Sequence, residues 1–346
     1  MRTPIRNNPR ITILASTVQN ATTVMPASGP GPAIGGTRHG AHRSWGDLIF
    51  ALAARASGGL VLLLLGGIIL SLFIGGIGAF RHFGLGFVTS TAWNPVKQDF
   101  GALVSVYGTL VTSAIALVLA VPLAFGIAFY LTELAPAWLR RPVGTAIELL
   151  AAVPSIIYGM WGFFVIVPIM SGIIQPAIIS AFDGIPVLQD LFAGPPFGTG
   201  IFTAAFILAV MVIPFVAATM RDVFETVPAV YKESAYGLGC TTWEVMRSIV
   251  LPYTRVSVVG GIMLGLGRAL GETMAVTFVI GNADRISTSL FGSGNTIASI
   301  VALEFPESPA GSLKLASLLA LGFILFVISF IVLAISRMLL RPKVAA

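Results

Sequence analysis

Two charged side chains in a strongly apolar, glycine-rich stretch carry the clearest chemistry in this sequence. Arg268 and Glu272 stand four residues apart within residues 257–281. Arg268 lies 11 residues past the start of this stretch, or about 16 Å along a helix. This places it near the centre of a bilayer, where a charge costs at least ~2.5 kcal/mol. Gly261 and Gly265 fall on the same helical face, so a neighbouring helix or a substrate could approach closely there.

The residues alone leave two interpretations of this pair open. In the first, Arg268 and Glu272 form a helical i, i+4 ion pair that neutralises itself and holds two helices together. In the second, Arg268 is a planar donor to a transported oxyanion, and Glu272 holds Arg268 or accepts a proton. Glu148 is a further acid predicted at membrane depth, paired with Arg140 or Arg141 or placed at the positive end of its helix.

Composition indicates a membrane protein. The chain has 346 residues, 56% of them apolar and 10% charged, whereas a typical soluble domain is about 25% charged. Backbone groups in lipid must be satisfied within the spanning segment, and no alternating pattern suggests a barrel. The sequence therefore predicts an all-α integral membrane protein with six transmembrane helices of about 20 residues or more. Their expected ranges are 60–80, 104–131, 147–170, 201–220, 257–281 and 313–335.

Membrane topology, rather than nucleic-acid binding, explains the formal charge of +6 and its distribution along the chain. If both termini are cytoplasmic, 15 basic residues lie inside and 4 outside, with Arg268 in the membrane, as the positive-inside rule requires. Residues 1–56 are rich in Pro, Gly, Ser, Thr and Arg and are predicted to be a disordered cytoplasmic leader. Residues 57–346 are the predicted permease domain. Cys240 is the single cysteine, which excludes an internal disulfide and a thiolate metal cluster.

Proline positions predict where helices bend. Pro154 cannot donate a backbone hydrogen bond, so we expect it to bend or break the third helix and free carbonyl groups at depth. Ser155, which follows this proline, joins Arg268, Glu272 and Glu148 as a candidate residue of the substrate pathway. The mixed segment 173–199 is predicted to be an outside loop with one short helix lying flat.

The polar segment 221–256 predicts two short cytoplasmic helices. The first begins near Pro228 and ends at Gly237 and Gly239. The second begins with a capping box of Thr241 and Glu244 and is expected to end at 251–252. The first helix places residues 230, 234 and 238 on one side, and the small residues 234 and 235 are expected to admit a partner surface. The segment has no strong basic stripe, which favours docking to a protein over resting on lipid headgroups.

This segment resembles the cytoplasmic loop of ABC importer permeases. The resemblance is carried by Glu233, Ser234, Ala235, Gly239, Ile249, Leu251 and Pro252 at the spacing of that family, with Ser234 where Ala is usual. It implies a coupling helix that docks into a cleft of an ATPase subunit. None of the four lysines fits a phosphate-binding Gly-x4-Gly-Lys-Ser/Thr loop, so the chain is predicted not to be an enzyme and any ATP hydrolysis is expected from a partner.

Further stretches narrow the resemblance to permeases of phosphate-specific importers, PstC type. They are residues 93–95, 100–103, 107–110, 131–136, 148–162 and 267–276. The resemblance implies a type I ABC importer permease (MetI-like) fold in a bacterial inner membrane and a heterodimer with a second permease subunit. It also implies an ATPase dimer, a periplasmic or lipid-anchored phosphate-binding protein, no cofactor, and phosphate passage at Arg268 and Glu272. A permease for molybdate or sulfate, an ion-driven secondary transporter, and a structural or sensory membrane subunit remain as alternatives.

Overall fold

The computed structural model of the protein describes residues 45–339. It has six helices long and apolar enough to span a membrane, which confirms the predicted all-α membrane fold. Most of the predicted leader, residues 1–44, lies outside the described residues, and its described part, 45–56, is helical rather than disordered because α2 begins at Trp45. The chain divides into two compact units at residues 61 and 62, and the described part of the first unit is the beginning of helix α2.

The elements follow one another as α2 (Trp45–Phe83), α3 (Gly86–Thr89), β1 (Trp93–Asn94), β2 (Asp99–Phe100), α4 (Leu103–Phe129), η1 (Tyr130–Leu134), α5 (Ala137–Ala151), α6 (Ser155–Trp161), η2 (Gly162–Ile166), α7 (Val167–Ile169), η3 (Met170–Ile174), α8 (Gln175–Ala181), α9 (Pro186–Leu191), α10 (Ile201–Glu225), α11 (Ala229–Gly237), α12 (Thr242–Val245), η4 (Met246–Val250), α13 (Leu251–Leu270), α14 (Met274–Thr277), α15 (Ile297–Glu304) and α16 (Leu313–Leu339). The η elements are wide π-helical turns, and most of them continue a neighbouring α-helix.

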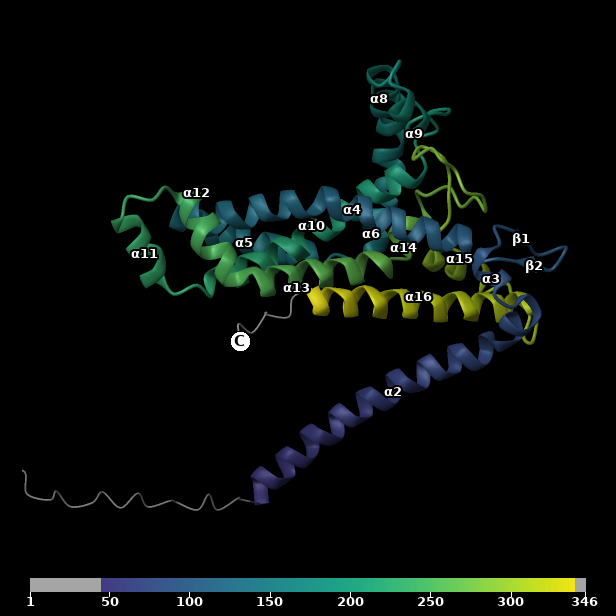
Figure 1. Ribbon diagram of the computed structural model, residues 1–346, viewed down its shortest axis with the longest axis horizontal. Helices are drawn as coiled ribbons and strands as arrows, with labels where there is room; N and C mark the ends of the chain where they lie inside the picture. Colours follow the sequence, from purple (N-terminus) through teal and green to yellow (C-terminus); the bar gives the residue numbers. More distant parts are fainter. Residues whose placement is uncertain (1–44, 340–346) are drawn as a thin grey trace, which may run out of the picture. The chain divides into compact units, whose positions relative to one another are not determined.

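Helix α10 is the centre of the second unit and packs along α4, α5 and α13 (Figure 1). Small side chains make this close packing possible. Helix α4 presents fully buried alanines at four-residue intervals, namely Ala116, Ala120, Ala124 and Ala128. On α13, a Cβ at Gly261 would lie 2.8 Å from Thr219 Cγ2, and one at Gly265 would lie 2.6 Å from Val216 Cγ2. The two glycines therefore let α13 approach α10, as small residues do between membrane helices.

The third span is broken where the sequence predicts it. Helix α5 ends at Ala151, and Pro154 is the N-cap of α6. The spanning helix itself covers Ser155–Ala181 rather than 147–170. Residues 173–181 are therefore helix and not outside loop, because wide turns η2 and η3 carry the apolar run onward past Pro168. The one short helix that was expected in this loop is α9.

The fifth span differs from the prediction at both ends. Leu251 and Pro252 do not end the second of the two predicted short helices, because α12, η4 and α13 form one helix from Thr242 to Leu270. Pro252 stands at the start of α13, directly after the wide turn η4. At this position the helix loses little from the missing N–H of proline. The helix then stops at Leu270 instead of 281, and the short helix α14 follows.

A small hairpin lies in the second unit, at the end far from α11. Strands β1 and β2 are antiparallel, with Trp93 opposite Phe100. Trp93 Nε1 donates a hydrogen bond to Glu304 at 2.9 Å, and Lys314 Nζ lies 3.1 Å from the same carboxylate. These contacts fix the hairpin to the α15–α16 connection, so Trp93 has a polar partner within the chain.

Candidate functional site

Three of the four predicted pathway residues, Arg268, Glu272 and Ser155, lie at two breaks in the spanning helices. The first break separates α5 from α6 at 152–154, and the second separates α13 from α14 at 271–273. Helices α6 and α14 pack against each other (Figure 1). A Cβ at Gly159 would lie 3.0 Å from Ala275 Cα and 3.0 Å from the Met274 carbonyl oxygen. This backbone contact joins the two segments that follow the breaks.

Arg268 occupies the last turn of α13, next to the second break, and is half-buried. Its guanidinium carbon lies 5.8 Å from the centre of the Phe215 ring, a distance suited to a cation–π contact. Its Nε is buried without a hydrogen-bond partner among the described residues.

Glu272 does not form the predicted helical pair with Arg268. The residue lies beyond the end of α13, and Glu272 Oε1 accepts a hydrogen bond from the Ala275 amide at 3.3 Å, at the start of α14. Among the described residues, no ion pair joins Glu272 to Arg268. The helical i, i+4 pair does not form because the helix ends at Leu270: Glu272 accepts a hydrogen bond from the Ala275 amide, and the Thr273 hydroxyl donates to the Gly271 carbonyl oxygen.

Ser155 and Tyr158 lie on the other side of the same region. Ser155 is the first residue of α6 and is half-buried. Tyr158 Oη donates a hydrogen bond to the Leu150 carbonyl oxygen at 3.0 Å, which ties α6 back to α5 across the Pro154 break. Sequence reasoning missed Tyr158, although its place four residues after the proline is where a side chain could reach freed carbonyl groups.

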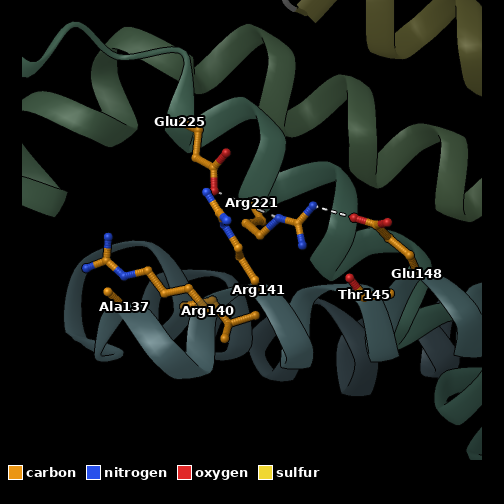
Figure 2. A pocket seen from close by; sticks show the side chains of 8 residues that line it. Ala137, Arg140, Arg141, Thr145, Glu148, Arg221 and Glu225 are labelled. Atoms are coloured by element: carbon orange, nitrogen blue, oxygen red, sulfur yellow. Dashed lines mark hydrogen bonds and ion pairs between the residues drawn. The ribbon is translucent and has the colours of Figure 1, made fainter.

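Glu148 belongs to a separate cluster with Arg221 of α10. Its Oε1 accepts from Arg221 Nη2 at 2.6 Å, whereas the predicted partners were Arg140 or Arg141 (Figure 2). The arginine also lies 2.9 Å from Asp222 Oδ1. Glu148 is exposed and stands on α5, before the third spanning helix begins. The predicted partners were wrong because α5 packs against α10, so its acid meets a residue 73 positions away.

The docking residues on α11 are split between the surface and the core. Val230 is 68% exposed and Leu238 87% exposed, and Ser234 between them is exposed too. Glu233 is also exposed, as is Gly239, which turns the chain at φ +88°. This is the surface that the sequence predicts.

Ala235 is buried, which corrects the prediction that its small side chain admits a partner. It packs into the core of its own chain, so its small side chain allows α11 to pack closely against that core. Ile249 and Leu251 are half-buried against the same core, and Pro252 is exposed. Of the proposed docking residues, these two large apolar ones therefore position the segment.

A buried ion pair that sequence reasoning missed holds α11 in place. Lys232 Nζ lies 2.5 Å from Glu133 Oε1, and the two side chains are 18% and 7% exposed. Glu133 belongs to η1, the wide turn at the end of α4. The pair therefore joins α11 directly to a spanning helix. A charged residue at the end of a long apolar run is the only sequence signal that pointed to Glu133.

Large apolar side chains are exposed around α11 as well. They are Val230, Tyr231, Tyr236, Leu238, Trp243 and Tyr253. Such a concentration in a polar segment is typical of a surface that a protein partner covers.

Comparisons with known proteins agree with this architecture. The profile of the family described as "Binding-protein-dependent transport system inner membrane component" matches residues 120–344. The "Phosphate transport system permease protein PstC" of Mesorhizobium japonicum is 60% identical over 85% of this chain and 90% of its own length. The protein of the same name from Pasteurella multocida is 58% identical over 85% of this chain and 91% of its own length.

Solved structures share the fold at much lower identity. A chain of a bacterial alginate ABC transporter, in complex with an alginate pentasaccharide-bound periplasmic protein, is 17% identical. It aligns with a TM-score of 0.52 over 88% of this chain and 99% of its own length.

Proposed function

Because the chain belongs to the family of binding-protein-dependent transport system inner membrane components, and within it to the PstC-type permeases, we propose that it carries inorganic phosphate across the bacterial inner membrane as the permease subunit of an ABC importer. The observation that carries this proposal is identity of 60% over 85% of the chain to a phosphate transport permease. Identity at that level over most of the chain supports a shared cargo.

Arg268 gives the proposal a physical basis. A half-buried guanidinium without a carboxylate partner among the described residues is a donor ready for an oxyanion. The lock interpretation required Glu272 to neutralise Arg268 within one helix, and the helix ends between them. Glu272, which caps α14, and Ser155 are proposed to shape the passage around Arg268.

The proposed assembly contains a second permease subunit, an ATPase dimer and a periplasmic or lipid-anchored phosphate-binding protein. ATP is hydrolysed in the partner, since the sequence lacks a phosphate-binding loop. The ATPase docks on the exposed face of α11, around Glu233, Ser234 and Gly239. Both termini are cytoplasmic, which the excess of inside arginine and lysine supports.

Uptake by the reconstituted importer tests the cargo. Proteoliposomes that contain both permease subunits, the ATPase and the binding protein are supplied with labelled phosphate and an excess of unlabelled molybdate or sulfate. We expect unlabelled phosphate to abolish labelled uptake and the two other oxyanions to leave it nearly unchanged. Stronger competition by molybdate or sulfate would overturn the cargo assignment, and uptake that persists without the ATPase would indicate a secondary transporter.

A further inference from the structure

A cavity of about 540 Å³ lies between α5 and the end of α10, outside the pathway residues around Arg268. Arg140, Arg141 and Arg221 line it together with Glu148 and Glu225 (Figure 2). Three arginines against two glutamates leave the lining with one net positive charge. The passage proposed around Arg268 does not include this cavity.

The negative charges of the cavity are already engaged by Arg221. This arginine contacts Glu148 at 2.6 Å, Asp222 at 2.9 Å and Glu225 at 4.0 Å. Its side chain lies across α5 at Gly144, where a Cβ would collide with Nη1. The glycine therefore allows Arg221 to reach Glu148, and all three carboxylates at this end of the cavity share Arg221 as their ion-pair partner among the described residues.

Arg140 and Arg141 leave most of their hydrogen-bonding capacity free. Arg140 Nε donates to the Ala135 carbonyl oxygen at 2.8 Å. Within residues 45–339, no other hydrogen bond or ion pair engages the Arg140 guanidinium, and none engages that of Arg141. Figure 2 shows the Arg140 guanidinium pointing away from the Arg221–Glu148 pair. The Arg141 guanidinium points toward Glu225 in Figure 2. Both guanidinium groups line the cavity with unfilled donors, and the planar fork of each matches the geometry of a phosphate group.

The surroundings place these arginines at the boundary between membrane and water. Trp138 is 75% exposed, Leu134 52% and Leu149 66%. A tryptophan and leucines exposed beside arginines are typical of the interface, where the apolar side chains contact lipid. Basic pockets between membrane helices on the cytoplasmic side bind lipid headgroups, and the orientation proposed above puts this cavity on that side.

We propose that the cavity is a binding site for a phosphate group at the cytoplasmic surface, held by Arg140 and Arg141. The group belongs either to an anionic phospholipid headgroup or to free inorganic phosphate in the cytoplasm. The proposal uses the orientation given under the proposed function but does not depend on the cargo. A bound headgroup would anchor α5 against α10, whereas bound inorganic phosphate would report the cytoplasmic phosphate level to the permease.

The test measures both ligands on the purified full chain in an Arg268→Gln background, which removes the pathway arginine from the measurement. The first probe is phosphatidylglycerol, counted by native mass spectrometry after reconstitution with phosphatidylcholine and phosphatidylglycerol. The second is labelled orthophosphate, measured by equilibrium binding in phosphatidylcholine nanodiscs. The test variant is Arg140→Gln with Arg141→Gln. The matched control is Arg247→Gln with Arg337→Gln, which removes two exposed arginines from the same membrane face.

We expect one of the two probes to bind about fivefold more weakly for each arginine removed in the test variant, and the control to bind as before. Loss of phosphatidylglycerol identifies the lipid, and loss of orthophosphate identifies the free anion. Thr145→Trp, which fills the cavity and keeps both arginines, should produce the same loss. Equal binding of both probes by test variant and control would overturn the proposal, even if the importer carries phosphate.

Discussion

Arg268 owes its chemical availability to the end of α13. In an uninterrupted helix, Arg268 would face Glu272 at i+4. The chain leaves the helix at Gly271, so Glu272 lies beyond the end of α13. The guanidinium then contacts the Phe215 ring and keeps a buried Nε without a hydrogen-bond partner among the described residues. An aromatic ring can hold the cation in place without occupying its donors, so the guanidinium remains able to bind an oxyanion.

Replacing Arg268 by Gln should abolish phosphate uptake without dissociating the complex. The variant loses two charge-assisted hydrogen bonds, each worth about 1.5–3 kcal/mol, so we expect a drop of at least about 100-fold. Arg268→Lys keeps the charge but loses the fork, and intermediate uptake is expected. Uptake is measured at equal amounts of assembled complex. Loss of assembly in Arg268→Gln would contradict this account and support a packing role.

Gly159 should tolerate no side chain, because its Cα faces the backbone of α14. In Gly159→Ala, the new methyl group would lie 3.0 Å from both Ala275 Cα and the Met274 carbonyl oxygen. We expect the free energy of unfolding to fall by about 1–3 kcal/mol and uptake to fall with it. Gly172→Ala is the matched control, since a methyl group added there would meet no atom within 4 Å. Equal thermal unfolding midpoints for the two variants would refute the close contact.

At the level of the elements, local signals in the sequence predicted helix starts well. The Thr241–Glu244 capping box is present with both of its hydrogen bonds, and Pro154 separates α5 from α6. These features depend on a few neighbouring residues. The continuation through Pro252 and the stop at Leu270 could not be predicted the same way. A wide turn absorbs the first proline, and side-chain bonds at 271–273 end the helix despite its apolar sequence.

Long-range partners were the part of the site that spacing could not reveal. Glu148 meets Arg221 and Glu133 meets Lys232, across 73 and 99 residues. Both pairs depend on which helices pack together, and apolar periodicity does not specify helix neighbours. The buried face of Ala235 was missed for the same reason, because its burial depends on the core beneath α11.

The Lys232–Glu133 pair should transmit movement of α11 to α4. Lys232→Met leaves the buried Glu133 carboxylate unpaired, so we expect a loss of stability of about 3–5 kcal/mol and less phosphate carried per ATP hydrolysed. The double variant Glu133→Gln with Lys232→Met removes both charges and should recover most of the stability. Lys97→Met, at an exposed lysine of the hairpin, is the control. Thermal unfolding and the ratio of transport to ATP hydrolysis are the readouts.

A double variant no more stable than Lys232→Met would show that the two charges do not interact. Unchanged transport per ATP in Lys232→Met would show that α11 does not act through α4.

For the whole molecule, the described residues contain six helices long and apolar enough to span a membrane and two helix breaks, at 152–154 and 271–273. Arg268, the proposed anion-binding side chain, lies beside one of these breaks, and α11 carries exposed apolar side chains. Its sequence has no phosphate-binding loop for a nucleotide. The proposed permease therefore provides the passage, and a partner subunit supplies the energy.

Site-specific crosslinking from α11 in the native assembly tests this division most directly. A photoreactive residue replaces Leu238, which is 87% exposed, and a second variant carries it at Val96, 94% exposed on the hairpin. We predict that position 238 joins covalently to a nucleotide-hydrolysing subunit and that position 96 does not. A native assembly in which position 238 captures no nucleotide-hydrolysing subunit would contradict the central claim.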